Sequence, residues 1–384
     1  MKCLDALMQE LCPDGVEFVK LGEVCNRNKG ISITAAKMKE INKKGAPVRI
    51  FAAGNTKADV EYCDIERKAV ITSPSVIIKS RGNIGFEYYD EPFSHKAEMW
   101  SYSAKDSKKI DIKFLFYYLS SKTDKFQTRA KANAVKLPQL SIGDTDNYEI
   151  PLPPISIQAE IVRILDTFTS LEAELDTELD CRKRQYAYYR DTLLSFEGKE
   201  GVAWKKLGEV CEILDSKRKP VAKGNRVKGD YPYYGANGIQ DYIDGYLFDG
   251  VYLLLGEDGS VINKDNSPIL NWATGKIWVN NHAHVLAEKK GEAILRYLYY
   301  VLQTCDVSPI VRGVPPKLNQ ENLRNIEFPI PSLEEQRRIV AILDRFESLT
   351  TSLQSGLPAE IAARRQQYAH YRDKLLTFRR KGAN

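Results

Sequence analysis

The sequence predicts an α+β chain in which two globular domains alternate with two long amphipathic helices, the whole arranged as a pseudo-two-fold internal repeat. Three observations carry this prediction. A polar-aromatic phrase occurs twice, two stretches have helical spacing of apolar residues, and two longer stretches are rich in short β-branched runs and turn residues.

The repeat is visible in colinear pairs of segments. RQYAYYRDTLLSF returns as RQQYAHYRDKLLTF, KLGEVC occurs twice, EIPLPPISIQAEI parallels EFPIPSLEEQRRI, and IVRILD returns as IVAILD. The repeat period is much longer than that of solenoid proteins, so each unit should be a domain with an attached element. The repeat also starts part-way through a unit, because Leu7–Cys25 resembles Leu193–Cys211. We therefore expect the two ends of the chain to meet and close a pseudo-two-fold arrangement.

The helices are predicted from apolar residues at three- and four-residue steps. The first stripe follows the stiff linker Pro151–Pro154 and comprises Ile161, Leu165, Phe168, Leu175, Leu179, Tyr186, Tyr189 and Leu193. The second stripe comprises Ile339, Leu343, Phe346, Leu353, Leu357, Ile361, Tyr368, Tyr371 and Leu375. The offset between the copies grows from 178 (339 − 161) to 182 (367 − 185) around Ser355–Ile361. Its Gly-Leu-Pro predicts an interruption, with Pro358 at a fresh helix N-terminus.

The globular stretches cover roughly residues 20–150 and 206–328. We expect short strands within 68–85, 245–261 and 275–286, and helices within 110–122 and 292–303. The two stretches match in outline only, with Arg81-Gly82-Asn83 aligned to Asp258-Gly259-Ser260 and His95 aligned to His282. Near-identical helices beside diverged globular parts suggest one scaffold that carries two different recognition surfaces.

Composition sets weaker bounds. A net charge of +5 is compatible with nucleic-acid binding, but it is equally compatible with ordinary solubility. Seven scattered cysteines without a CxxC pair suggest reduced thiols in a cytoplasmic protein. No apolar run is long enough to span a bilayer, and acidic residues within the N-terminal apolar stretch argue against a signal peptide.

A search for catalytic motifs is negative. The chain has no phosphate-binding GxxxxGK loop, no GxGxxG, no HExxH and no Cys/His cluster at zinc spacing. His282 and His284 would share one side of a strand, as a metal pair or, more simply, as part of a polar strand. Glu257-Asp258 fits turn chemistry better than acid catalysis. The basic run Ser216–Pro220 is either a solvated loop or a phosphate contact.

Basic residues also lie off the helical seam. They are Arg182, Lys183, Arg184, Arg190, Arg364, Arg365 and Arg372. They would suit an acidic partner protein or DNA phosphates.

Three segments, PLPPISIQAEIVRILD, RQYAYYRDTLLSF and GLPAEIAARRQQYAHYRDKLLTF, resemble the conserved regions of the specificity (S) subunit of type I restriction–modification systems. The segments YPYYGANGIQDYIDGYLFDGVYLLLGEDGSV and GKIWVNNHAHVL are similar to a target-recognition domain of that family. The resemblance covers essentially the whole chain, in the right order.

The resemblance implies two α+β target-recognition domains held apart by two antiparallel coiled-coil helices. It implies a non-catalytic protein that reads a split sequence in double-stranded DNA, one half per domain. The implied partners are two modification subunits, which use S-adenosylmethionine, and restriction subunits, which use ATP and Mg²⁺. No cofactor is expected in this chain, no membrane is involved, and the expected location is the cytoplasm.

The implied division is target-recognition domain 1 with a short N-terminal helix (1–150), central helix (151–205), target-recognition domain 2 (206–328) and C-terminal helix (329–384). Base and phosphate contacts need cationic, amide and hydroxyl side chains on loops. The predicted DNA-binding residues are Asn55, Lys57, Lys79, Arg81, Asn83, Lys96, Lys217, Arg218, Tyr234, Asn237, Lys276, Asn281, His282 and Arg312.

Alternatives remain open at this level. One is a coiled-coil scaffold, or an assembly or inhibitor protein, that does not bind DNA. Another is a metal-dependent nuclease that uses Glu257 or Asp258. A further hypothesis treats the long helix as a ruler: about 35 residues give about 50 Å, roughly one and a half turns of B-DNA, which would set the gap between half-sites.

Overall fold

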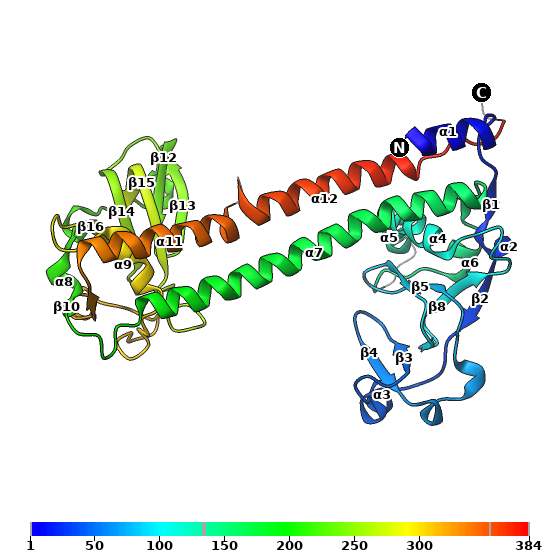
Figure 1. Cartoon of the computed structure of the whole chain (residues 1–384), viewed down its shortest axis with the longest axis horizontal. Helices are drawn as coiled ribbons and strands as arrows, with labels where there is room; N and C mark the ends of the chain where they lie inside the picture. Colours follow the sequence, from blue (N-terminus) through cyan, green and yellow to red (C-terminus); the bar gives the residue numbers. More distant parts are fainter. Residues whose placement is uncertain (1, 133–135, 353–354, 383–384) are drawn as a thin grey trace. The chain divides into compact units, whose positions relative to one another are not determined.

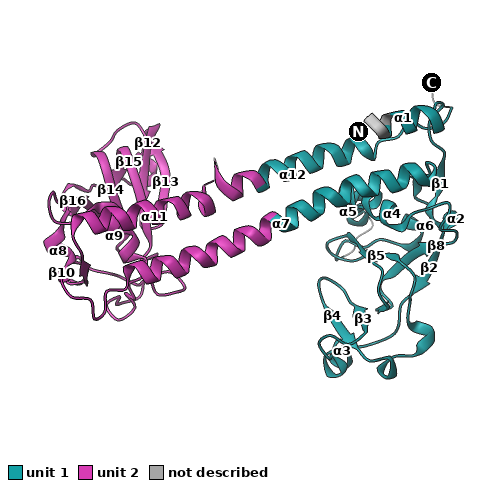
Figure 2. Ribbon diagram, in the orientation of Figure 1, with its two compact units in different colours: residues 1–174, 361–384 teal, residues 175–360 magenta. Residues whose placement is uncertain are grey.

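The computed structural model describes residues 2–132, 136–352 and 355–382, and it divides into two compact units. Unit 1 comprises residues 1–174 and 361–384, and unit 2 comprises residues 175–360 (Figure 2). Helix α7 (Ile155–Leu194) therefore contributes to both units, as does α12 (Gly356–Leu375). The predicted four-part division cuts the chain differently, at the helix ends, and stays a prediction.

Unit 1 begins with the short helix α1 (Lys2–Leu11) and holds two larger sheets and the short pair β1-β9 (Figure 1). Its other elements are β1 (Phe18–Lys20), α2 (Leu21–Val24), β2 (Cys25–Lys29), α3 (Ala35–Ile41), β3 (Val48–Phe51), β4 (Lys57–Val60), β5 (Ser75–Lys79), β6 (Gly85–Tyr89), β7 (Phe93–His95), β8 (Trp100–Ala104), α4 (Ile112–Ser120), α5 (Thr123–Ala132), α6 (Ile142–Asp146) and β9 (Glu149–Pro151). One sheet has the order β2-β8-β5-β6 and the other has the order β4-β3-β7. The first packs its apolar residues with α4, α5 and the start of α7 in one core.

Unit 2 has a larger sheet of order β11-β16-β14-β15-β12-β13. Its elements are β10 (Ala203–Lys206), α8 (Leu207–Val210), β11 (Cys211–Ile213), β12 (Lys228–Gly235), β13 (Gly238–Ile243), β14 (Phe248–Gly256), β15 (Leu270–Val279), β16 (Ala283–Glu288), α9 (Leu295–Leu302), α10 (Gln320–Arg324), β17 (Glu327–Ile330) and α11 (Leu333–Thr351). Only Asn280–His282 link β15 to β16, although both strands run antiparallel to β14. The sheet is therefore strongly curled, and it encloses a cluster that includes Leu254, Ile277 and Val285. Strands predicted within 245–261 and 275–286, and helices predicted within 110–122 and 292–303, are confirmed.

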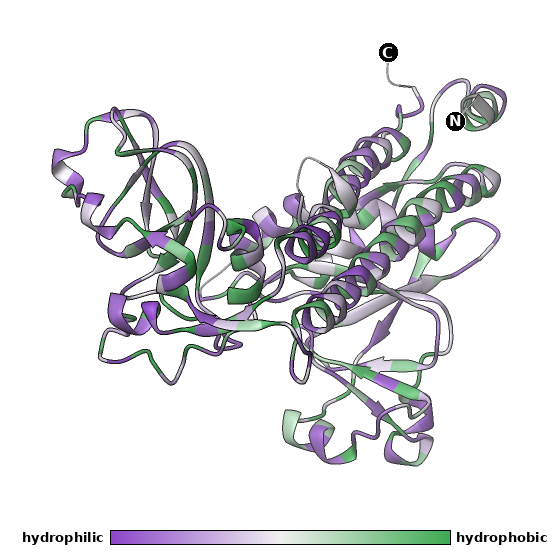
Figure 3. Cartoon of the chain, turned by 60° about the vertical axis from the view of Figure 1, so that its left-hand side comes forward, coloured by the Kyte–Doolittle hydropathy of each residue, from purple (hydrophilic) through white to green (hydrophobic). Residues whose placement is uncertain are grey.

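The long helices form as the apolar spacing predicts. Figure 3 shows hydrophobic and hydrophilic residues alternating along each long helix, as expected for amphipathic helices. The predicted interruption is confirmed, since α11 ends at Thr351 and α12 starts at Gly356, with Pro358 in its first turn. Gly356 has φ +80°, and a Cβ there would lie 2.6 Å from the carbonyl oxygen of Ser348, so only glycine fits this junction. Leu353 of the predicted stripe lies outside the described residues.

Two aromatic stacks join the helices. In unit 1, Phe168 of α7 stacks on Tyr371 of α12 with ring centroids 5.5 Å apart. In unit 2, the repeat-related residues exchange roles: Phe346 of α11 stacks on Tyr189 of α7 at 5.3 Å. Such reciprocal contacts are what a two-fold relation between two copies produces. In unit 1 an ion pair joins Glu172 to Arg365 at 2.6 Å, so residue numbers rise along α7 while they fall along α12 and the helices are antiparallel.

The expected meeting of the chain ends is confirmed within unit 1. The backbone N–H of Val16 donates to Arg379, and that of Lys381 donates to Val16, at 2.8 and 2.9 Å. In unit 2 the equivalent stretch is continuous chain between α7 and β10. The N-terminal segment therefore completes non-covalently what the middle of the chain builds covalently.

The helix-to-domain junction is also duplicated. Buried Gln158 donates to the carbonyl of Pro153 and accepts from the N–H of Asp111, at 2.8 and 2.9 Å. Buried Gln336 repeats this pattern with Pro331 and Ile294, both at 2.9 Å. A glutamine with both amide ends satisfied in a buried site fixes the angle at which helix and domain meet.

The two domains share loop geometry as well. Gly82 and Gly259 have φ +77° and +76°, and their N–H groups donate to Pro138 and Pro316 at 2.8 and 2.9 Å. The alignment of Arg81-Gly82-Asn83 with Asp258-Gly259-Ser260 is thereby confirmed. The alignment of His95 with His282 is wrong. The pairing of β2 with β8 and of β11 with β16 makes Ala104 equivalent to Glu288, so the counterpart of His282 is Glu98.

Two further expectations concern cysteines and membranes. The six cysteines whose side chains are described are all free thiols, as predicted; the side chain of Cys3 lies outside the described residues. No helix in the described ranges is both long enough and apolar enough to cross a membrane.

Candidate nucleic-acid interface

Three predicted residues of the first domain gather around one carboxylate. Lys57 of β4 and Lys79 of β5 both form ion pairs with Glu87 of β6, at 2.5 and 3.0 Å. The ammonium of Lys79 also lies 3.5 Å from the side-chain oxygen of Asn55. Burial alone would raise the pKa of Glu87, but the hydrogen bonds and charges of the two lysines outweigh it, so the pKa is lowered. A carboxylate kept ionised here orients both lysines at the surface.

The other three predicted residues of the first domain, Arg81, Asn83 and Lys96, lie on or beside the loop that follows β5. Arg81 and Asn83 are exposed on the loop after β5. Lys96 forms an ion pair with Glu98 at 2.9 Å, and the backbone oxygen of Glu98 accepts from the hydroxyl of Ser80. The predicted residues of this domain are therefore clustered at the end of β5 and beside it.

In the second domain the loop Asn280–His282 is the centre of the contacts. The N–H of Asn280 donates to Tyr234 at 3.0 Å, and the carbonyl of His282 accepts from Glu257 at 2.8 Å. The His282 imidazole bonds to Asp258 through a very short contact. The structure thus brings predicted residue Tyr234 beside the loop that holds predicted residues Asn281 and His282, although Tyr234 is distant from that loop in the sequence.

The remaining predicted residues differ in how accessible they are. Lys217, Asn237 and Arg312 are exposed, whereas Tyr234 is 9% exposed. Lys276 is exposed on β15, and its ammonium lies 4.7 Å from the centre of the Tyr246 ring, which is a cation–π contact. No contact in the described part of the chain links Lys276 directly to the Asn280–His282 loop.

Arg218 is occupied inside the domain. Its side chain is 12% exposed, and its guanidinium donates to Glu257 at 2.6 Å and to the carbonyl of Ala283 at 2.7 Å. It also lies 3.4 Å from Asp215. Arg218 was predicted to bind DNA, but its guanidinium is instead paired with carboxylates and a backbone carbonyl inside the domain.

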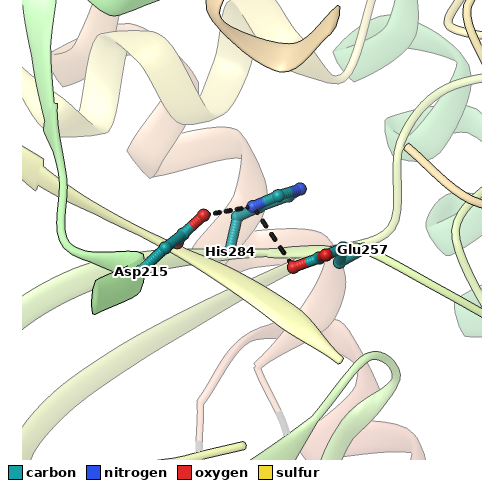
Figure 4. A group of neighbouring side chains, drawn as sticks. All are labelled: Asp215, Glu257 and His284. Carbon is teal, nitrogen blue, oxygen red and sulfur yellow. Dashed lines mark hydrogen bonds and ion pairs between the residues drawn. The ribbon is translucent and has the colours of Figure 1, made fainter. Parts of the chain in front are cut away.

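Asp215, Glu257 and His284 form a compact group next to the Asn280–His282 loop (Figure 4). Nδ1 of His284 lies 2.6 Å from a carboxylate oxygen of Asp215 and 3.6 Å from one of Glu257. Asp215 also accepts from the N–H of Val285 and from the amide of Gln320, at 3.0 and 2.9 Å. Burial by itself would raise the pKa of Asp215, but His284, Val285 and Gln320 outweigh burial and lower the pKa.

The donor set does not fit a metal ion, although ligand atoms of the three side chains lie within 4.8 Å of one another. Nε2 of His284 donates to the carbonyl of Leu318 at 2.8 Å, so this nitrogen offers no lone pair to a cation. The guanidinium of Arg218 lies 3.4 Å from Asp215 and would repel a second cation placed beside it. Arg218 and Lys317 already neutralise Glu257, at 2.6 and 3.3 Å. The group is a hydrogen-bonded charge network that ties the loops to the sheet.

Two alternatives from the sequence are weakened by this geometry. His282 precedes β16 and His284 lies in it, and their rings bond to different carboxylates, so they do not form the suggested pair on a strand. Glu257 and Asp258, considered for a nuclease, are engaged by Arg218 and His282. Neither carboxylate is left as a ready metal ligand.

Sequence reasoning missed two exposed apolar residues, Val314 at the tip of the loop closed by Arg312 and Lys317, and Leu137 directly before Pro138. An available signal was an apolar residue directly before proline in an otherwise polar loop, in both copies. It also missed Asp215 as the centre of the charge network, and no local pattern marks that residue. The fourteen predicted residues stay predictions as DNA contacts.

Many of the basic residues off the helical seam have local partners. Arg182 bonds to Glu178 and Arg365 bonds to Glu172, at 2.7 and 2.6 Å. Arg190 and Arg372 each contact the following aspartate. These pairs lie partly or fully in contact with solvent, so each contributes little to stability.

Comparison with known proteins supports the resemblance to specificity subunits that the sequence suggests. The family model for the type I restriction modification DNA specificity domain matches twice, at residues 13–180 and 199–363, in step with the repeat. A putative type I restriction enzyme specificity subunit of Haemophilus influenzae is 44% identical over 187 residues, which are 47% of this chain and 48% of that protein. A type I restriction enzyme specificity subunit of Escherichia coli is 33% identical over 301 residues, 71% of this chain and 72% of that protein.

A solved structure agrees in fold. The crystal structure of the type I restriction–modification system S subunit from M. genitalium has a TM-score of 0.60 and 17% identity, and the match covers 94% of this chain and 95% of that one. Two matches to the family model span most of the chain, and they coincide with its two β-rich domains and their helices. This chain therefore belongs to the family of type I restriction–modification DNA specificity subunits.

Proposed function

We propose that this chain reads a bipartite sequence in double-stranded DNA, with one half contacted by each globular domain. One observation carries the proposal. The two domains hold equivalent loops with the same backbone hydrogen bonds, at Gly82 and at Gly259, but the loops carry different side chains. A shared frame with diverged surfaces is what two separate base-reading sites require.

The chemistry belongs to other subunits. A specificity subunit of a type I restriction enzyme is its non-catalytic component, and the cofactors reside on the modification and restriction subunits. The partners we propose are two modification subunits with S-adenosylmethionine, and restriction subunits with ATP and Mg²⁺. The proposed location is the cytoplasm, where these partners and the DNA would be found.

The ruler hypothesis also stays a proposal. Helix α7 has 40 residues, which correspond to about 60 Å at 1.5 Å per residue. Its companion is divided into α11 and α12. Of the two helical copies, α7 is the one that is unbroken over its whole length.

The test is co-purification with the modification subunit encoded beside this chain, followed by methylome sequencing of cells that express the pair. We expect a bipartite adenine motif that is absent when this chain is deleted and absent when the modification subunit is expressed alone. A stable complex that adds no methylation would favour the alternative of a scaffold that does not read DNA.

A further inference from the structure

A groove in unit 1 lies beside the small sheet β4-β3-β7. Its volume is about 680 Å³, and its two walls are residues 29–33, which follow β2, and residues 64–69. The fourteen residues predicted to bind DNA are absent from its lining, as far as the described residues extend. The groove is therefore a different surface from the one around Glu87.

Both walls of the groove are held against one edge of β7, while β3 occupies the other edge. The N–H of Ile31 donates to His95, and its carbonyl accepts from Ala97, both at 2.8 Å. Ile71, two residues beyond the second wall, exchanges backbone hydrogen bonds with Phe93 at 2.7 and 2.9 Å. Because backbone pairing already orders both walls, binding in the groove would cost little conformational entropy.

Gly30 lets the first wall lie directly on the sheet. A Cβ at this position would lie 2.3 Å from the carbonyl oxygen of Lys96, so no other residue fits without moving the wall away. Ile31 then forms a parallel bridge with Lys96. The wall therefore adds a strand-like segment to this edge of β7.

The outer side of this segment is an unpaired strand edge. Backbone N–H and C=O groups of successive residues in a strand point to opposite sides, so those of Ser32 point away from β7. Ser32 is exposed, and in the ranges that the structure describes its N–H and C=O form no hydrogen bond. An unpaired edge of this kind pairs readily with an added strand.

The apolar residues that line the groove are only half-buried. They are Ile31, Ile33, Ile65 and Ala69. The three isoleucines pack against the buried cluster that includes Met38, and their exposed parts remain open to apolar side chains of a ligand. In an extended peptide every second side chain faces the same way, so a peptide with apolar residues at alternate positions suits this lining.

Cations outnumber carboxylates in the groove. Its charged residues are Lys29, Lys37, Lys68, Asp64 and Glu66. Glu66 lies 2.9 Å from Lys68 in an exposed pair, which contributes little. No described residue forms an ion pair with Lys29. The surplus of positive charge favours acidic residues in the ligand.

We infer that the groove binds an extended acidic segment of a partner protein, which adds a strand to the free edge at Ser32. Apolar side chains at alternate positions of the segment would lie over Ile33 and Ile65, and its carboxylates would reach Lys29. A DNA duplex also carries negative charge, but it has no row of amide donors and carbonyl acceptors that could pair with a strand edge. The inference goes beyond the proposed function and does not depend on it.

The experiment selects phage-displayed linear heptapeptides on the whole chain, immobilised. We expect enrichment of peptides in which acidic and apolar residues alternate. A synthetic copy of an enriched peptide should bind Lys29→Glu about fivefold more weakly than the wild type, because an attractive charge pair becomes repulsive. Ser32→Pro, which removes the N–H of Ser32, should weaken binding about tenfold.

The matched control is Lys44→Glu, at an exposed lysine of unit 1 outside the groove, which should bind the peptide like the wild type. A second measurement alters the peptide and leaves the fold untouched. Methyl groups on one alternate set of its backbone amides should weaken binding about tenfold. Methyl groups on the other set should weaken binding less, because only one edge of the added strand faces Ser32.

Selection of no peptide family, or equal enrichment on the wild type and on Lys29→Glu, would overturn the inference. Equal loss of binding with either set of methyl groups would also overturn it, because backbone pairing would then not hold the peptide. Weaker binding of duplex DNA by Lys29→Glu in the complex with the modification subunit, with no peptide enriched, would mean that the groove contacts DNA. That result would overturn the inference and leave the proposed function intact.

Discussion

Two buried ionisable residues, His95 in the first domain and Asp215 in the second, differ in whether they carry a charge at neutral pH. His95 has only neutral partners, the hydroxyl of Ser101 at 3.2 Å and the carbonyl of Lys96 at 3.4 Å, and burial lowers its pKa to about 4. Asp215 is also buried, but its donors lower its pKa against the effect of burial. The first residue is therefore neutral at physiological pH and the second is charged, although both lie close to residues predicted to bind DNA.

Asp215→Asn should destabilise unit 2 in a pH-dependent way. A carboxyl group whose folded pKa is below its unfolded value, about 3.9, stabilises the fold above that value, and the stabilisation is lost as pH falls through the folded pKa. We expect a loss of about 3 kcal/mol at pH 7, because the substitution removes the buried carboxylate nearest to His284 and one of the two carboxylates beside Arg218. Thermal unfolding at pH 7 and towards pH 3 should show the gap between variant and wild type shrinking.

The control for this measurement is Asp249→Asn, at an exposed position of β14. It should unfold like the wild type throughout. A gap for Asp215→Asn that stays constant with pH would mean that the carboxylate charge contributes nothing and that only packing is lost.

At the scale of elements, the same joints occur twice. The carboxylate of Asp166 accepts from Lys113 and Tyr117 of unit 1, at 2.7 and 2.6 Å. In unit 2 the carboxylate of Asp344 accepts from Arg296 and Tyr300, at 2.7 and 2.5 Å. Each domain is thus tied to its long helix by one carboxylate, one cation and one tyrosine.

The aromatic stack between α7 and α12 should be measurable as a coupling energy. A double-mutant cycle of Phe168→Ala and Tyr371→Ala in denaturant unfolding should give about 1 kcal/mol, since the rings are stacked at the helix seam and partly exposed. The control cycle pairs Phe168→Ala with Tyr62→Ala, an exposed tyrosine of unit 1, and should give additive effects. Additivity in the first cycle would contradict a role for the stack in joining the helices.

At the scale of the whole molecule, duplication separates what must stay from what is free to change. The helices, the glutamine joints and the loop anchors are repeated, while the side chains around Glu87 and around the Asn280–His282 loop are not. A chain built in this way should exchange one reading surface without disturbing the other.

Replacing residues 206–328 by the corresponding region of a diverged family member should change one half of the methylated motif. The other half should persist, because unit 1 keeps its own core and its own candidate contacts. Methylome sequencing of the chimaera beside the parent chain decides the matter, and loss of both halves would contradict modular reading. A chain in which the original residues 206–328 have been put back into the chimaera serves as the control, and it should regain the parent motif.

The repeat, the two long helices, the break at Gly356 and the family could all be predicted from the sequence. The repeat, the helices and the break follow from periodicity and from order along the chain, which are local properties of the sequence. The family follows from the resemblance of several segments to its conserved regions. The sequence also indicated a cationic and amide-rich surface, without showing which of those side chains the fold uses internally.

The roles of the buried residues depend on contacts that form only in the folded chain. Asp215, Glu257 and His284 lie on three separate segments, and curling of one sheet brings them into a network that occupies Arg218. The same folding leaves Val314 outside, at the tip of a hairpin that the network secures. Contacts between distant segments depend on strand pairing and sheet curvature, and no spacing within the sequence records them.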